Sequence, residues 1–179
     1  MIVSRAASRY AKALLELAQE QKVLEQVHED MLFFAKTVEE NRGLLLMLQS
    51  PVVPHFKKFN ILREIFQSRV HPTTFTIFEI ITRKNREKIL YDIAKAFHEL
   101  YNSFNNIQVA QIVTTFELDE QQRSHFRKIT EEVTGKKIEL QEKIDPALIG
   151  GFVLHIGDRQ VDESIKGKLQ KLQYDFIHS

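Results

Sequence analysis

The chain has 179 residues, of which 43% are hydrophobic and 27% are charged, and its formal net charge is +1. This is the composition of a globular protein of one domain or two small ones, and it argues against a disordered chain or a polycation that binds nucleic acid non-specifically. Cysteine is absent, which excludes disulfides, thiolate metal sites and cysteine nucleophiles, and no run of about 18 apolar residues could span a bilayer.

Residues 4–104 carry apolar side chains at helical spacing in six short segments, with a single glycine among them. Ser4 is expected to cap the first helix, whose apolar stripe contains Tyr10 and Leu14. Asn41 is expected to cap a short third helix.

Prolines and polar residues mark the starts of the remaining helices. Pro54 is expected to open the fourth helix and His71-Pro72 the fifth, while Asn85 is expected to cap the sixth. Short amphipathic helices with short breaks predict a compact six-helix bundle for residues 1–105.

The pattern changes between residues 102 and 107, where the composition becomes polar. Alternating apolar residues then predict a strand from Gln108, and Asp119 and Gly135 are expected to bound a helix. Two or three strands and a last helix follow. The fold class is therefore mainly α, with the six-helix bundle followed by a small α+β domain of order β-α-β-β-α over residues 106–179.

The segment before the last helix has the most specific pattern in the chain. Asp145-Pro146 is an N-cap followed by proline at the first helical position. Gly150-Gly151 leads into a strand and lacks the later residues of a phosphate-binding loop, so these glycines are expected to serve the backbone conformation alone. Asp162 is expected to cap the last helix.

The last helix combines an apolar stripe with a basic cluster. The stripe consists of Ile165, Leu169, Leu172 and Phe176, and the cluster of Arg159, Lys166, Lys168 and Lys171. The cluster could receive an acidic helix or an RNA backbone, but no aromatic stacking platform accompanies it, which favours a solvated face over RNA. Gly167 costs this helix about 1 kcal/mol relative to alanine, and either close packing compensates or the helix is simply weaker.

Three segments carry a family resemblance. The Asp-Pro turn, GG, alternating strand, GD, D-x-S-I and K-x-x-L-x-x-L run resembles the C-terminal signature of the delta subunit of F-type ATP synthases, the oligomycin-sensitivity-conferring protein family. The opening SRAASRYAKALLELA resembles the first helix of that family, with its Tyr-Ala-x-Ala segment, and KNREKILYDI resembles its last N-domain helix. The resemblance spans nearly the whole chain.

The resemblance implies a non-catalytic stator subunit that resists rotor torque. Its helical domain would hold the N-terminal helices of the alpha subunits, and its smaller domain would hold the C-terminus of the b-type stalk subunit through Lys166 and Leu169. No catalytic residue, metal or cofactor is expected, since the seven histidines are scattered. An RNA-binding or protein-scaffold adaptor, with a helical bundle and an α+β reader, is the alternative.

The resemblance also implies a location. No Arg/Ser-rich transit segment precedes the first helix, so the family points to a bacterial form at the cytoplasmic face of the plasma membrane. The subunit would be peripheral, without membrane insertion or nucleic-acid binding, and a monomer outside the complex.

An alpha-subunit helix is expected to dock between the first and fifth helices. Tyr10, Ala13 and Leu14 would line one wall, and Phe78 and Ile81 the other. Small residues beside Tyr10 leave a shallow groove next to its ring, although a tyrosine at the rim of the core has equal weight.

Overall fold

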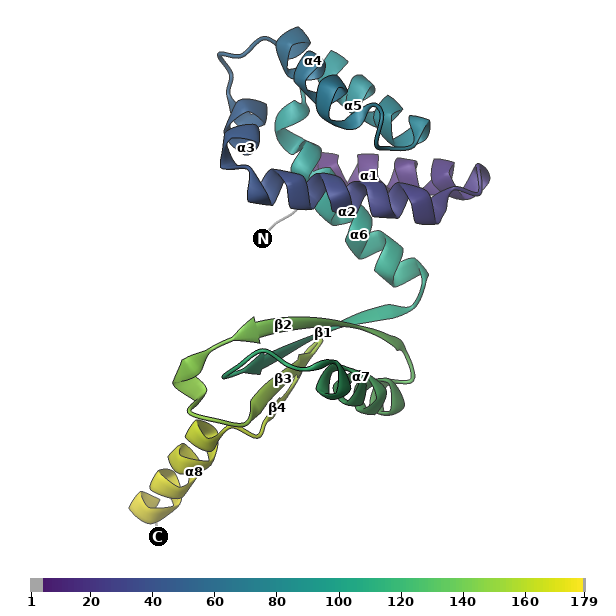
Figure 1. The fold of residues 1–179 in the computed structure, drawn as a ribbon. Coiled ribbons are helices and arrows are strands. Elements are labelled where there is room, and N and C mark those ends of the chain that lie inside the picture. The colour runs from purple at the N-terminus through teal and green to yellow at the C-terminus, as the bar shows by residue number, and fades with distance from the viewer. Residues whose placement is uncertain (1–4, 179) are drawn as a thin grey trace. The chain divides into compact units, whose positions relative to one another are not determined.

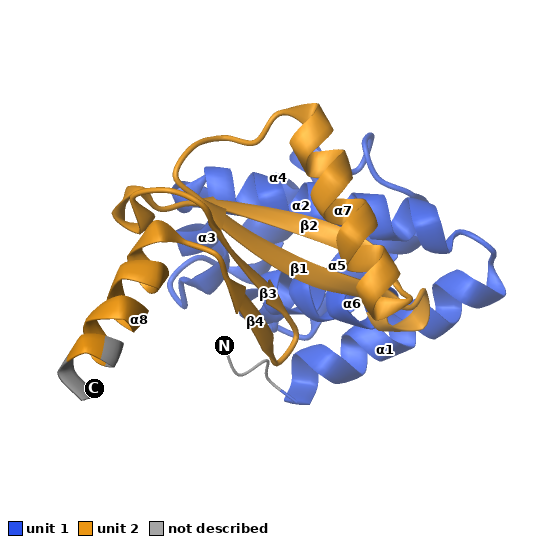
Figure 2. Ribbon diagram, turned by 90° about the horizontal axis from the view of Figure 1, so that it is seen from below, with its two compact units in different colours: residues 1–102 blue, residues 103–179 orange. Residues whose placement is uncertain are grey.

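The computed structural model describes residues 5–178 and divides the chain into two compact units, one reaching to Asn102 and the other beginning at Ser103 (Figures 1 and 2). The sequence predicts this division three residues later, after residue 105. The described chain is mainly helical and contains one small four-stranded sheet.

The first unit is built from helices alone in its described part. Their bounds are α1 Arg5–Glu20, α2 Leu24–Glu40, α3 Arg42–Gln49, α4 His55–Phe66, α5 Pro72–Arg83, the 3₁₀ turn η1 Glu87–Ile89 and α6 Leu90–Phe104. The amphipathic stripes close on one another around a cluster of phenylalanines. The rings of Phe34, Phe66 and Phe78 join α2, α4 and α5 with centroid distances of 4.8 to 5.9 Å.

The start of α5 confirms the prediction from His71-Pro72. The ring nitrogen Nδ1 of His71 accepts a hydrogen bond from the backbone N–H of Thr73 at 3.3 Å, and Pro72 is the first helical residue. Asp30 of α2 strengthens this start, because its Oδ2 accepts hydrogen bonds from the N–H of His71 and the hydroxyl of Thr74, each at 2.7 Å.

Two other predicted caps differ from their prediction. Asn85 is not a cap: it adopts a left-handed backbone with φ of 53°, and the chain enters η1 one residue later, from Arg86. Asn41 occupies the N-cap position of α3 as predicted, but its carboxamide donates back to the carbonyl of Thr37 at 2.8 Å and makes no cap hydrogen bond to α3. Asparagine serves a left-handed turn or the end of a helix as readily as a helix start. The predicted cap Ser4 lies outside the described residues.

The second unit is a sheet covered by one helix. Its elements are β1 Ile107–Thr114, α7 Glu120–Thr134, β2 Lys137–Ile144, the 3₁₀ turn η2 Pro146–Leu148, β3 Phe152–Ile156, β4 Arg159–Asp162 and α8 Ile165–His178. The strand order is β2-β1-β3-β4, with β1 parallel to β2 and antiparallel to β3. Of the two or three strands expected after α7, the structure has three, one more than the order β-α-β-β-α contains. The additional strand, β4, has four residues, all exposed, so it carries no burial pattern.

Helix α7 has the bounds that the sequence predicted. The carboxylate of Asp119 accepts from the N–H of Gln122 at 2.7 Å, and the Gln122 side chain accepts from the N–H of Asp119 at 3.0 Å. Gly135 ends the helix with φ of 66°, which a residue without Cβ adopts at no steric cost. The core under α7 contains Ala110, Ile112, Leu118, Ile138 and Leu154.

One charged residue interrupts the helix-covered face of the sheet. Glu142 follows Ile138 and Leu140 on that face of β2, in register with Ile112 of β1. Arg123 of α7 binds both oxygens of the Glu142 carboxylate and also Glu120. The hydrogen bond to Glu142, and to a lesser extent the one to Glu120, raises the pKa of Arg123 above its usual range. The pair therefore ties α7 to the sheet.

Candidate protein-docking surfaces

Three kinds of feature would indicate a function in the described residues: a metal-ligand cluster, a membrane-spanning helix or an exposed apolar surface. No three acidic or histidine side chains gather there in a way that could hold a metal ion. None of the described helices has the length and apolar character needed to cross a bilayer. Each unit exposes several large apolar side chains, and in each unit some of them form a row on a helix that carries predicted site residues.

Two side-chain hydrogen bonds tie α1 to the neighbourhood of α5, one near each end. The hydroxyl of Thr73, at the start of α5, donates to Gln21 just after α1 at 2.6 Å. The guanidinium of Arg86, just after α5, donates to the hydroxyl of Tyr10 in the first half of α1 at 3.2 Å. The two helices therefore run antiparallel.

The surface between these two bonds is partly apolar. Tyr10 is half-buried, Ala13 is exposed and Leu17 is 39% exposed, and these residues share one row of α1. On α5, Ile77 is half-buried and Ile80 is 38% exposed. We call these five residues the α1–α5 surface.

Three of the predicted wall residues provide no surface in this structure. Leu14, Phe78 and Ile81 are at most 1% exposed and belong to the core of the first unit. The apolar spacing of a helix is the same for residues that face the core and for residues in the adjacent row. The sequence pattern therefore could not separate core residues from residues of the exposed surface. The exposed apolar residues Leu17 and Ile80, just outside the core row, are the signal in the sequence that marks this surface.

The second unit exposes the apolar stripe of α8. Ile165, Leu169 and Leu172 are 46%, 53% and 53% exposed, and Phe176 is 82% exposed. The helix extends away from the sheet of its own unit and is held at its first turn (Figures 1 and 2). The predicted site residues Lys166 and Leu169 are therefore both exposed on one free helix.

The first turn of α8 is capped by Ser164 and not by the predicted Asp162. The Ser164 hydroxyl accepts from the N–H of Gly167 at 2.9 Å and donates to Asp162 at 2.6 Å, while Asp162 also accepts from the N–H of Ser164 at 2.9 Å. The hydrogen bond from the Ser164 hydroxyl has the largest effect on the pKa of Asp162 and lowers it, and the bond from the Ser164 N–H lowers it further. A Cβ on Gly167 would lie 2.7 Å from the Asp162 carboxylate, so close packing explains this glycine.

The Gly150-Gly151 pair brings the strand β3 against the same turn. Gly151 has φ of 75°, and a Cβ there would collide with the backbone carbonyl of Glu163. The N–H of Glu163 donates to Phe152 of β3, and the N–H of Ile165 donates to the carbonyl of Gly150, each at 3.0 Å. The predicted conformational role is confirmed, and the close approach to the base of α8 adds to it.

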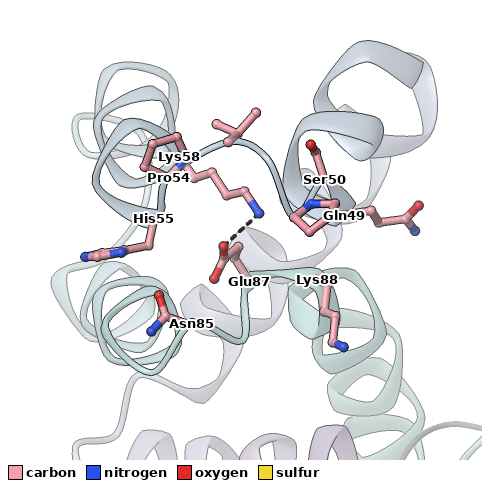
Figure 3. Close-up of a pocket in the computed structure, with 10 residues that line it drawn as sticks. Gln49, Ser50, Pro54, His55, Lys58, Asn85, Glu87 and Lys88 are labelled. Atoms are coloured by element: carbon pink, nitrogen blue, oxygen red, sulfur yellow. Dashed lines mark ion pairs between the residues drawn. The ribbon is translucent and has the colours of Figure 1, made fainter.

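A hollow of about 600 Å³ in the first unit is lined by a buried ion pair (Figure 3). The Nζ of Lys58 on α4 lies 2.7 Å from Oε1 of Glu87, and these side chains are 4% and 8% exposed. The same Nζ donates to the carbonyl of Leu48 on α3 at 2.9 Å. Oε2 of Glu87 accepts no hydrogen bond from the described residues. The pair thus joins three elements of the first unit.

Comparisons with known proteins agree over most of the chain. The family model of the ATP synthase delta (OSCP) subunit matches residues 6–176. ATP synthase subunit delta of Amoebophilus asiaticus is 38% identical over 95% of this chain and 93% of that protein. Its counterpart in Cytophaga hutchinsonii is 36% identical over 97% of this chain and 94% of that protein.

A solved structure shares the fold. One chain of the mitochondrial ATP synthase hexamer of Toxoplasma gondii, determined by electron cryo-microscopy, has a TM-score of 0.75. The match covers 97% of this chain and 98% of that chain, at 21% sequence identity. It therefore shows that the fold is alike over the full length of both chains.

Proposed function

Because this chain belongs to the ATP synthase delta (OSCP) subunit family, whose members are non-catalytic stator components, we propose that its two units dock different partners. The first unit, as a six-helix bundle, binds the N-terminal helix of an alpha subunit. The second unit binds the C-terminus of the b-type stalk subunit. The observation that carries this proposal is that each unit exposes an apolar row of side chains that its own core leaves uncovered.

The alpha-subunit helix docks on the α1–α5 surface. Tyr10 offers an apolar ring whose hydroxyl is held by Arg86, and Ala13 leaves room for a helix to approach closely. Leu17 and Ile80 supply apolar area on the two sides. An amphipathic helix laid between two helices is a common mode of protein recognition. Leu14, Phe78 and Ile81 support this surface from the core.

The stalk subunit docks on the stripe of α8. The chain is a peripheral part of the membrane complex and lies on the cytoplasmic face of the membrane. Outside the complex the chain is a monomer. Neither docking surface requires nucleotide, metal or nucleic acid. Membership of the family favours the stator function over an RNA-binding adaptor.

The change Tyr10→Asp tests the first surface. It places a charge where the incoming helix removes water, and an unpaired desolvated charge is costly. We expect at least about tenfold weaker binding of an alpha-subunit N-terminal peptide in calorimetric titration, with little change in melting temperature because Tyr10 is only half-buried.

Ser8→Asp is the matched control, because Ser8 is exposed on the opposite side of α1 and should leave the affinity unchanged. If Tyr10→Asp unfolds the first unit, Tyr10 belongs to its core. If affinity and melting both stay at the values of the unchanged protein, the helix docks elsewhere.

The change Leu169→Asp tests the second surface. Leu169 is at the middle of the stripe and 53% exposed, so the isolated protein should keep its stability. Binding of a peptide from the C-terminus of the b-type subunit should weaken about thirtyfold, as for a central anchor. Gln170→Asp adds the same charge beside the stripe and should bind normally. Equal affinities for the two variants would place the stalk site off this helix.

A further inference from the structure

Ile149 combines a strained backbone with an exposed side chain. Four described residues other than glycine have positive φ: Lys22, Asn85, Asn106 and Ile149. Ile149, with φ of 69° and ψ of −35°, is the β-branched member of this group. With this ψ the residue lies outside the αL region, and a β-branched residue at positive φ is a genuine outlier. Asparagine is found at positive φ several-fold more often and lacks the branch at Cβ.

Burial does not compensate for this strain. The side chain of Ile149 is 66% exposed, so little of its apolar surface is removed from water. Its N–H donates to the carbonyl of Pro146 at 3.2 Å, a bond that any residue other than proline could make. The fold of the isolated unit would therefore be served better by asparagine or glycine at this position.

The position of Ile149 connects it with the surface of α8. The next residue, Gly150, accepts a hydrogen bond from the N–H of Ile165 at 3.0 Å, and Ile165 is the first residue of the stripe. Ile149 therefore lies at the base of the stripe. Strained residues collect at binding sites, where their cost is offset by function.

We propose that Ile149 is an anchor for the b-type stalk subunit, filling an apolar site on the partner while the α8 stripe covers the partner's apolar face. This inference rests on the proposed docking of the stalk at α8. The partner is an amphipathic helix whose apolar face is flanked by acidic residues.

The charges beside the stripe select an acidic partner. Lys168 is paired with Glu163 at 2.8 Å. Lys166 and Lys171 are exposed and make no ion pair with another described residue. Of these two, Lys166 adjoins the stripe, next to Leu169 around the helix. Its unpaired ammonium group favours carboxylates on the partner and disfavours basic flanks.

Ile149→Asn in the full-length chain tests the anchor, because it predicts effects of opposite sign. Removing the strained branched residue should raise the melting temperature by about 2–4 °C, the shift that roughly 1 kcal/mol produces in a chain of this length. Losing the anchor should weaken binding of the b-type C-terminal peptide by about tenfold or more. Val133→Asn is the control, since Val133 is 67% exposed on α7 and should leave the peptide affinity unchanged.

The outcomes separate this inference from the proposed function. If Leu169→Asp weakens binding of the peptide and Ile149→Asn does not, the proposed anchor role of Ile149 is wrong and the docking on α8 stands. If neither change affects binding, the docking on α8 fails as well. A melting temperature that falls in Ile149→Asn would also overturn the anchor, because the residue would then serve the fold.

The partner's charge has its own measurement. Lys166→Glu should lower the peptide affinity at low salt, with a smaller loss at high salt, where charges are screened. A higher affinity for this variant would show that the partner's flanks are basic.

Discussion

Gly151→Ala is expected to lower the free energy of unfolding of the second unit by about 3 kcal/mol or more. Two effects add at this position. Alanine in the left-handed region costs about 1–2 kcal/mol, and its Cβ would collide with the backbone carbonyl of Glu163, which cannot rotate away as a side chain could. The base of α8 must shift, so binding of the stalk peptide should weaken too.

Two other glycines separate these effects. Gly135 has φ of 66° but open space around it, so Gly135→Ala measures the strain alone, at about 1–2 kcal/mol. Gly43 has open space and no positive φ, so Gly43→Ala should stabilise α3 by about 0.5–1 kcal/mol. Urea unfolding followed by circular dichroism gives all three values. Equal losses at Gly151 and Gly135 would contradict the close approach of Glu163.

Lys58→Met is expected to destabilise the first unit by about 3–5 kcal/mol, because it leaves the Glu87 charge buried without its partner. One oxygen of that carboxylate already lacks a hydrogen bond from the described residues. The carbonyl of Leu48 also loses the hydrogen bond from Lys58. Urea unfolding of the full chain measures the loss.

The double change Lys58→Met with Glu87→Leu should recover most of that loss, since apolar side chains can replace a buried ion pair at little cost. Lys36→Met is the control. Lys36 pairs with Glu40 at 3.9 Å on the surface, and such pairs contribute about 0–1 kcal/mol. If Lys58→Met and Lys36→Met have similar effects, the buried pair does not hold the three elements together.

Local chemistry made several features predictable from the sequence. Asp119 and Gly135 bound α7 through hydrogen bonds and a backbone conformation that depend on immediate neighbours. The same holds for Asp145, whose carboxylate accepts from the N–H of Ala147 at 2.9 Å at the start of η2. Such signals need no knowledge of the tertiary structure.

Features that depend on distant partners were not predictable. The sequence alone gives no reason for a glutamate at position 142 among the apolar residues of its strand face, because its partner Arg123 lies on α7. Leu14 was placed in a groove because helical spacing cannot show which of two adjacent rows faces the core. Ile149 gave no signal, because an exposed isoleucine looks ordinary until its φ is known.

The attachment of α8 has a mechanical consequence for a stator. A pull on α8 is carried along the backbone into β4, the edge strand that ends just before the helix. The Glu163–Phe152 and Ile165–Gly150 hydrogen bonds give the load a second path, into β3 and the residues just before it. β3 is an interior strand, paired with β1 on one side and β4 on the other. These two hydrogen bonds therefore keep the load on the helix from falling on the single ladder of an edge strand alone.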